Sequence, residues 1–150
     1  MISVVRGDIL ESKACVLVNP VNTDGIMGKG LALQFKNKFP EMFLEYKEVC
    51  KKGGFVIGEI HVWQNPDKNP AFIVNFPTKK SWRDKSKIEY ITCGLDELTT
   101  FMNLYKIPSV AIPPLGCGLG GLDWTKVRAL IWYKMHDLVC PTEVTIYEPY

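Results

Sequence analysis

The chain has 150 residues, of which 47% are hydrophobic and 23% are charged, and its formal net charge is +2. This length and composition fit one globular domain with a buried core. A net charge of +2 excludes a whole-chain electrostatic attraction to nucleic acid, so any basic patch has to be local.

The five cysteines are scattered, without a C-x-x-C pair or a histidine partner, which argues for reduced thiols in a cytosolic protein and against a zinc site. The first residues do not have the layout of a signal peptide, and no apolar run approaches membrane-spanning length. We therefore expect a cytoplasmic protein with no membrane contact, no bound metal and no cofactor.

Apolar runs and helical patterns alternate along the chain. Strands are predicted at 2–5 and 15–22, and the nearly continuous apolar character of the second fits a strand covered on both faces. After them come predicted helices at 31–38 and 41–52, strands at 55–63 and 71–76, a helix at 86–105, a strand at 109–113, a helix at 123–138 with Asp123 as its N-cap, and a strand at 143–148. No repeat or linker interrupts this order. It predicts one α/β domain over residues 1–150, a three-layer α/β/α sandwich around a mixed, mostly parallel six-stranded sheet.

Two glycine-dense segments, 22–30 and 113–121, each lie between a predicted strand and a predicted helix. Such loops present free backbone N–H groups together with the positive end of a helix dipole, which is a recurring way to bind phosphate. Ligands of open parallel sheets lie at the carboxyl ends of the strands, where both loops fall. Two phosphate loops in one small domain predict a bound diphosphate.

Other interpretations of these loops stay open. Residues 116–121 satisfy G-x-G-x-x-G, but a Rossmann fingerprint opens its domain, and only one helix and one strand follow here. Residues 25–30 lack the spacing of a P-loop and its Ser or Thr for magnesium. Both segments can also be tight turns with no ligand.

Two polar segments also fall at predicted strand ends. Asp8 can accept a hydrogen bond from an exocyclic amine such as that of adenine, or it can be a turn residue or an N-cap. Segment 75–83 combines cations with an aromatic ring, a pairing that binds phosphodiester backbone and stacks an unpaired base. A lysine near other cations can also lose its proton and act as a nucleophile or base. The simpler interpretation is a solvated basic turn. The side chains concerned are Lys79, Lys80, Trp82 and Arg83.

Three further residues are interpreted as having no catalytic role. His61 and His136 stand apart from any Ser, Cys or Asp constellation and are expected to be structural or surface residues. Cys117 lies inside the second glycine segment without a base partner, so it is expected to be a small residue where the backbone approaches a ligand.

Together these segments resemble the macrodomains, the ADP-ribose-binding fold. The resemblance spans essentially the whole chain and rests on 7–9, 18–22, 28–30, 112–118 and 146–149. Within that fold, three segments are similar to the DarG-type antitoxins, which are DNA ADP-ribosyl glycohydrolases that reverse the modification of thymidine bases by a DarT-type toxin. These segments are 27–36, 75–83 and 120–124.

The resemblance implies a role for each candidate site residue. Asp8 would recognise the adenine amine, with Ile9 and Tyr147 beside the adenine. Asn22 would contact the distal ribose, and Lys79 would be the catalytic lysine at its anomeric carbon. The diphosphate would be enclosed by Gly28, Lys29 and Gly30 on one side and by Leu115, Gly116, Cys117, Gly118, Leu119 and Gly120 on the other. Lys80, Trp82 and Arg83 would face the DNA.

The chain departs from a related branch of the family at one position. The terminal ADP-ribose glycohydrolases pair a lysine with an aspartate in the second glycine loop, where this chain has Gly120, while Asp123 comes later. The resemblance therefore implies that Lys79 acts at C1″ either as a nucleophile or by stabilising charge on the departing base.

The expected function is removal of ADP-ribose from thymidine bases of single-stranded DNA, as an antitoxin that reverses a DarT-type toxin. A non-catalytic ADP-ribose reader and a hydrolase of ADP-ribosyl esters on proteins are the alternatives. We expect a monomer whose partners are ADP-ribose, ADP-ribosylated single-stranded DNA and the toxin. The 150 residues are expected to be either a standalone protein or the N-terminal domain of a longer antitoxin.

Overall fold

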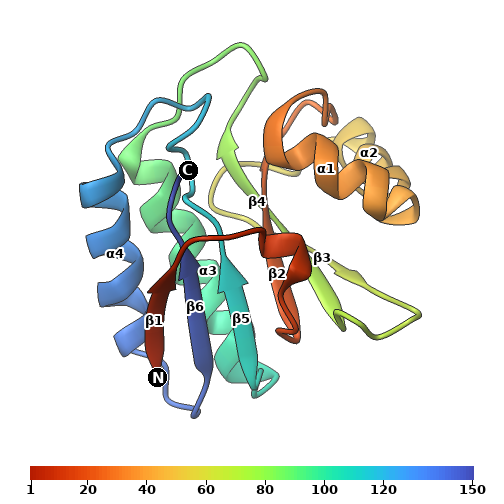
Figure 1. Ribbon diagram of the computed structural model, residues 1–150. Helices are drawn as coiled ribbons and strands as arrows, with labels where there is room; N and C mark the ends of the chain where they lie inside the picture. The colour runs from red at the N-terminus through yellow and green to blue at the C-terminus, as the bar shows by residue number, and fades with distance from the viewer.

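One mixed sheet of six strands runs through the molecule, which a computed structural model describes over residues 1–150. The strands lie in the order β1-β6-β5-β2-β4-β3 (Figure 1). All neighbours are parallel except the edge strand β3, which is antiparallel to β4. The predicted mixed, mostly parallel sheet is confirmed. The strands are β1 (Ile2–Val5), β2 (Val16–Asn22), β3 (His61–Gln64), β4 (Phe72–Lys79), β5 (Ser109–Ile112) and β6 (Glu143–Tyr147).

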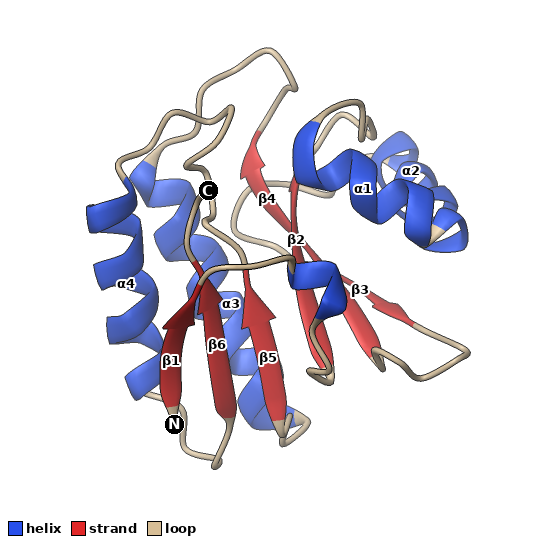
Figure 2. Cartoon of the chain, in the orientation of Figure 1, coloured by secondary structure: helices blue, strands red, loops and turns tan.

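Helices cover both faces of this sheet and complete the predicted three layers (Figure 2). One pair packs on β2 and β3, and the other pair lies on the opposite face, where its first helix contacts β4. The pairs are α1 (Gly30–Lys38) with α2 (Pro40–Lys52), and α3 (Ile88–Leu104) with α4 (Trp124–His136). None of these helices is long and apolar enough to cross a membrane.

The side chains of strand β2 contribute to the packing of the helix layers on both faces of the sheet. Val16 and Val18 belong to the apolar cluster under α3 and α4, whereas Leu17 and Val21 belong to the cluster under α1 and α2. Side chains of a strand alternate between faces, so a strand buried on both sides needs apolar residues throughout. Burying one such aliphatic side chain contributes about 1.5–3 kcal/mol. The carboxyl end of β2 is therefore firmly placed at the centre of the sheet.

The prediction of a strand at 55–63 is wrong for residues 55–60, because strand β3 begins only at His61. Phe55 is buried by packing edge-on against Tyr46 of α2 rather than by strand pairing. Gly58 has φ +92°, a left-handed conformation that interrupts an extended chain. Apolar burial against a helix thus produced the same sequence pattern as a strand.

Three smaller differences concern element ends. Ile9–Glu11 forms a short 3-10 helix that the sequence pattern did not predict, and Asp8 caps it by accepting a hydrogen bond from the Leu10 N–H at 3.0 Å. Asp123 occupies the N-cap position of α4 as predicted, but its side chain makes no capping hydrogen bond. β4 continues beyond the predicted end at 76, so that Lys79 is its last residue.

Candidate functional site

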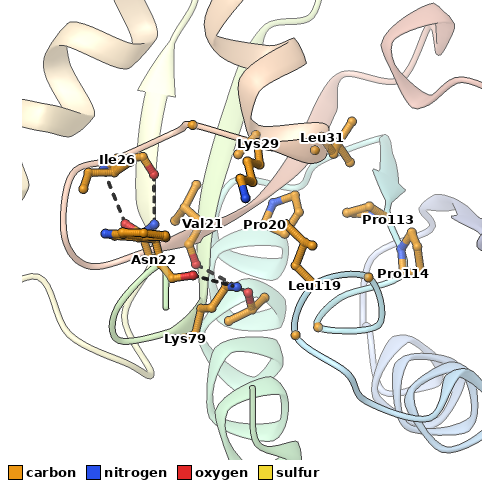
Figure 3. A pocket seen from close by; sticks show the side chains of 18 residues that line it. Pro20, Val21, Asn22, Ile26, Lys29, Leu31, Lys79, Pro113, Pro114 and Leu119 are labelled. Carbon is orange, nitrogen blue, oxygen red and sulfur yellow. Dashed lines mark hydrogen bonds between the residues drawn. The ribbon is translucent and has the colours of Figure 1, made fainter. Parts of the chain in front are cut away.

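A cavity of about 670 Å³ opens at the carboxyl ends of β2, β4 and β5, between the two glycine segments (Figure 3). Its volume is typical of pockets that hold small-molecule ligands. Lys29 and Lys79 are the charged residues of the lining, which contains no Asp or Glu. The lining residues are Pro20, Val21, Asn22, Ile26, Gly28, Lys29, Gly30, Leu31, Ala32, Thr78, Lys79, Trp82, Pro113, Pro114, Gly116, Gly118, Leu119 and Gly120.

The pairing of β2 with β4 brings Asn22 next to Lys79. Val21 pairs with Pro77, but the next residue, Asn22, pairs with Lys79, so Thr78 is an extra residue in β4. Such a bulge changes the direction of the side chain that follows it. Neighbouring strands lie about 4.8 Å apart, so the two candidate catalytic residues start from adjacent backbone positions.

The Asn22 side chain is held by hydrogen bonds on both of its polar atoms. Nδ2 donates to the Ile26 carbonyl at 2.9 Å, and Oδ1 accepts from the Asp24 N–H at 3.0 Å and from the Tyr46 hydroxyl at 2.8 Å. The Tyr46 hydroxyl oxygen also lies 2.7 Å from the Asn22 backbone carbonyl oxygen. Burial raises the pKa of the Tyr46 phenol, which therefore stays protonated as a donor. One Nδ2 hydrogen is left for a ligand, since a carboxamide nitrogen carries two.

Replacing Tyr46 with phenylalanine tests this support for Asn22. Losing the hydroxyl leaves the buried Asn22 oxygens with fewer donors, so we expect the free energy of unfolding to fall by about 1–3 kcal/mol. Urea denaturation measures this change. Tyr133→Phe is the control, because Tyr133 is 66% exposed. Equal unfolding midpoints for the two variants would show that the Tyr46 hydroxyl does not hold Asn22.

Lys79 is half-buried, and its Nζ lies 3.4 Å from the Trp82 carbonyl oxygen, to which it donates. Burial lowers the pKa of its amine, and the positive charge of Lys85 lowers it further, while Asp84 acts in the opposite direction. A lysine with a lowered pKa has a larger fraction of free amine at neutral pH. The amine can then act as a nucleophile.

The first glycine segment leads into the amino terminus of α1. Lys29 is the N-cap residue and its side chain makes no capping hydrogen bond, so the first N–H groups of the helix have no side-chain partner. Gly30 has φ +59°, which favours glycine at this turn. Free N–H groups, the helix dipole and the Lys29 ammonium all favour an anion here.

The second glycine segment leaves no room for a side chain at Gly120. A Cβ atom built there would lie 2.3 Å from Ser86 Oγ and 2.5 Å from the Gly116 carbonyl oxygen. The Ser86 N–H donates to the Gly120 carbonyl at 3.0 Å, and Ser86 Oγ is buried without a hydrogen-bond partner. This packing explains in physical terms why no aspartate stands at position 120.

Residues 80–86, here called the bridging segment, connect the two glycine segments across the pocket. At one end the Lys80 carbonyl accepts from the Thr23 N–H at 3.1 Å, and the Trp82 N–H donates to Asp24 Oδ2 at 3.2 Å. At the other end Ser86 bonds to Gly120, as described above. The bridging segment is therefore tied to both loops.

The predicted DNA-facing residues lie on this bridging segment. Trp82 lines the pocket and is 44% exposed, and the Arg83 guanidinium carbon lies 5.0 Å from the centre of its ring. Lys80 and Arg83 are exposed but are not pocket-lining residues. An accessible aromatic ring thus lines the pocket, with the Arg83 cation against it.

The predicted adenine-binding residues lie together outside the pocket lining, at the carboxyl ends of β1 and β6. Ile9 belongs to the apolar cluster under α1 and α2, and Tyr147 packs against the same cluster. Asp8 is exposed, and its Oδ1 already caps the 3-10 helix. Their contact with adenine stays a prediction.

Leu115 and Cys117 lie within the second glycine segment but are not among the lining residues. Leu115 is fully buried, and the Cys117 thiol donates to its carbonyl at 3.5 Å. Burial, followed by the charge of Asp123, raises the pKa of Cys117 to about 11. Such a thiol is a poor nucleophile at neutral pH, as expected from the sequence.

Neither histidine lies in the pocket lining. His61 is half-buried between Glu45 Oε2 at 2.8 Å and Asn75 Nδ2 at 3.0 Å, and His136 is exposed. No group of three or more His, Cys, Asp or Glu side chains lies close enough together to hold a metal ion.

Sequence reasoning missed the apolar half of the pocket lining. Its residues come from the end of β2, the two glycine segments and the first turn of α1, where burial inside the core and burial against a ligand need the same residue types. The only available signal was their position next to the glycine segments. These residues are Pro20, Val21, Ile26, Leu31, Ala32, Pro113 and Pro114, and the buried polar residue Thr78 was missed with them.

The family model described as Macro domain matches residues 18–131. The chain belongs to the macrodomain family. The match contains both glycine segments, β4 and the bridging segment. All the residues that line the cavity of this macrodomain therefore lie within the part of the chain that matches the family model.

Relatives with established names extend this result. A protein of Thermus aquaticus named DNA ADP-ribosyl glycohydrolase is 45% identical over 99% of this macrodomain, which covers 41% of that protein. The solved macrodomain of Mycobacterium tuberculosis DarG is 44% identical with a TM-score of 0.97, and the match covers 100% of this chain and 99% of that one. Thermosipho africanus DarTG, solved in complex with ADP-ribose, is 33% identical with a TM-score of 0.87, over 97% of this chain and 41% of that one. This macrodomain thus spans about two fifths of the length of the curated relatives it matches.

Proposed function

We propose that this macrodomain is a DNA ADP-ribosyl glycohydrolase that removes ADP-ribose from thymidine bases of single-stranded DNA. The observation that carries the proposal is the position of Lys79, which pairs with Asn22 at the ends of β4 and β2 and lines the same pocket between the two glycine segments. Support also comes from the Thermus aquaticus relative, which is named DNA ADP-ribosyl glycohydrolase.

In the proposed complex the diphosphate lies between the amino terminus of α1 and the second glycine segment. Backbone N–H groups and the Lys29 ammonium neutralise its charge. The adenosine half extends towards Asp8, Ile9 and Tyr147, and the distal ribose reaches Asn22 and Lys79. The modified thymidine then leaves the pocket beside Trp82.

The chemistry proposed for Lys79 follows from the composition of the lining. Many glycosidases use two carboxylates around an oxocarbenium-like transition state, but this lining has none. A thymine that departs through nitrogen spreads negative charge onto its carbonyl oxygens, so it needs less protonation than an alkoxide. Lys79 is left to attack C1″ or to stabilise this charge, and Asn22 positions the ribose.

The same pocket would also serve an ADP-ribose reader or a hydrolase of protein-linked esters, so turnover has to be measured. The substrates are an oligonucleotide with one ADP-ribosylated thymidine and a glutamate-modified peptide, with calorimetric titration of free ADP-ribose in parallel. We expect binding in the calorimeter and release from the oligonucleotide. Binding without release would identify a reader, and release from the peptide alone would identify an ester hydrolase.

The DNA-facing role of Arg83 has its own test. Binding of the modified oligonucleotide should weaken with salt more steeply than binding of free ADP-ribose, because phosphate contacts release counterions. Replacing Arg83 with alanine should reduce the salt slope by about 1. Arg128→Ala on α4, outside the pocket lining, is the control. Equal salt slopes for DNA and ADP-ribose would exclude a DNA contact by the bridging segment.

Trp82 should contribute by stacking on an unpaired base. Replacing it with alanine should weaken oligonucleotide binding by about 1–3 kcal/mol, while the affinity for free ADP-ribose changes less. Fluorescence anisotropy with labelled oligonucleotide measures the first quantity and calorimetry the second. A loss of equal size for both ligands would place Trp82 on the ADP-ribose rather than on the DNA.

We further infer that the domain acts as a cytoplasmic, monomeric antitoxin against a DarT-type toxin. The proposal is supported by the similarity to Thermosipho africanus DarTG and to two DarG macrodomains. Co-expression with such a toxin should restore growth and remove modified thymidine from cellular DNA. Light scattering of the purified domain should give a mass near 17.0 kDa.

A further inference from the structure

The second glycine segment carries several backbone N–H groups that no other group of the protein uses. Leu115, Cys117 and Gly121 donate to carbonyls of the same segment. The remaining N–H groups make no hydrogen bond within the protein, and the residues that carry them all line the pocket. These residues are Gly116, Gly118, Leu119 and Gly120. An anion on this side of the pocket would therefore meet backbone donors that are free to bind it.

A buried serine at the end of the bridging segment lies directly against this loop. Ser86 is only 6% exposed, and its N–H donates to the Gly120 carbonyl at 3.0 Å. A Cβ atom built on Gly116 would lie 3.1 Å from Ser86 Cβ and 3.3 Å from Ser86 Oγ, and one built on Gly120 would overlap the same Oγ. The Ser86 side chain thus fills the space that the two glycines leave between them.

The Ser86 hydroxyl has no hydrogen-bond partner although it is buried. Such a group is rare in folded proteins, because it loses its hydrogen bonds to water and gains none in return. Packing alone does not require a hydroxyl here, since alanine would place the same Cβ atom against the two glycines without a polar atom. A hydrogen bond that forms only in another state of the loop would explain why this position carries a serine.

The Gly116 carbonyl oxygen is an acceptor close to this hydroxyl. Both oxygens lie within 2.5 Å of the position that a Gly120 Cβ atom would occupy, yet no hydrogen bond joins them. The carbonyl already accepts from the Leu122 N–H at 2.9 Å, and its second lone pair can take another donor. Gly116 has φ +73°, and a glycine can rotate in this region without a Cβ clash. A small rotation of the loop can therefore bring the hydroxyl and the carbonyl into contact.

We propose that Ser86 is a positioning residue for the diphosphate. When a diphosphate binds the free N–H groups, the second glycine segment shifts, and the Ser86 hydroxyl donates to the Gly116 carbonyl and holds the segment in its ligand-bound conformation. Because the hydroxyl is unpaired in the ligand-free protein, its pairing contributes to the free energy of binding. This inference rests on the proposed function, which assigns the diphosphate to this loop, and it adds a residue that lies outside the pocket lining.

The test compares two variants of Ser86. Ser86→Ala removes the hydroxyl, whereas Ser86→Cys keeps a side chain of similar shape that is only a weak donor. Ser3→Ala is the control, because Ser3 is an exposed serine on β1. The readouts are the Tm without ligand and the calorimetric affinities for ADP-ribose, inorganic pyrophosphate and adenosine. Turnover of the modified oligonucleotide is measured in parallel, so failure of the proposed function is seen separately from failure of this inference.

Ser86→Ala should stabilise the ligand-free domain and weaken its binding of phosphate ligands. The Tm should rise by about 2–4 °C, because the unpaired buried hydroxyl is gone. The affinities for ADP-ribose and pyrophosphate should fall by about 5- to 10-fold, the contribution of one hydrogen bond, while that for adenosine changes by less than about twofold. Ser86→Cys should lose affinity in the same way, and Ser3→Ala should match the wild type. On the modified oligonucleotide KM should rise by the same factor with kcat unchanged.

A crystal structure of the wild-type domain with ADP-ribose should place Ser86 Oγ about 2.7–2.8 Å from the Gly116 carbonyl oxygen. An unpaired Ser86 hydroxyl in that complex would overturn the inference. So would an unchanged affinity of Ser86→Ala for both phosphate ligands, or a loss of equal size for adenosine. A lower Tm of both ligand-free Ser86 variants would also overturn it, because the hydroxyl would then already be paired in the free protein.

Discussion

Replacing Lys79 with alanine is expected to lower release of ADP-ribose from a modified oligonucleotide by at least about 10³-fold. The affinity for free ADP-ribose should change by less than about threefold, because in the proposed complex the backbone of the two loops holds the diphosphate. Single-turnover kinetics and calorimetry measure the two quantities. Wild-type release by Lys79→Ala would remove this residue from the mechanism.

Lys79→Arg separates the two roles left to the amine. A guanidinium keeps the positive charge but is not deprotonated in proteins, so it can stabilise a departing base and cannot attack C1″. If the amine is a nucleophile, arginine should be as inactive as alanine. Activity between that of alanine and wild type would indicate charge stabilisation. Lys52→Ala, on the exposed end of α2, is the control for loss of a lysine.

Replacing Gly120 with aspartate is expected to abolish ADP-ribose binding rather than to create the lysine–aspartate pair of the related enzymes. The new Cβ would overlap Ser86 Oγ and the Gly116 carbonyl, so the second glycine segment has to move. Overpacking of this kind costs about 1–3 kcal/mol, which lowers the Tm of a domain of this size by about 2–12 °C. Thermal unfolding and calorimetry measure the two effects.

Gly118 provides the matched control in the same loop. A Cβ atom built there meets nothing within 4 Å, so Gly118→Ala should keep the wild-type Tm. Gly120→Ala should lower it, and Ser86→Gly in the same molecule should restore part of the loss by removing the nearer clash. A stable Gly120→Asp variant that hydrolyses a glutamate-linked ester would contradict this account of the site.

The glycine segments and the order of elements were readable from sequence because their signals are local. Gly30 and Gly116 take left-handed backbone angles that other residues rarely adopt, so their residue type is visible without any partner. The alternation of apolar runs with helical patterns likewise depends only on neighbours in the chain. Segment 55–60 shows the limit of such local signals. Phe55 is an apolar residue that packs on α2, and it does not lie in a strand.

The sequence by itself therefore determined the α/β layers and the presence of two glycine-rich loops with a basic segment near them. Only the tertiary structure decided how these parts meet. Asn22 stands beside Lys79 because β2 and β4 pair with an extra residue at Thr78, and Gly120 is obligatory because Ser86 fills the space next to it. Both relations join residues more than 30 positions apart in the sequence. Their geometry depends on strand register and packing, which cannot be read from a local sequence pattern.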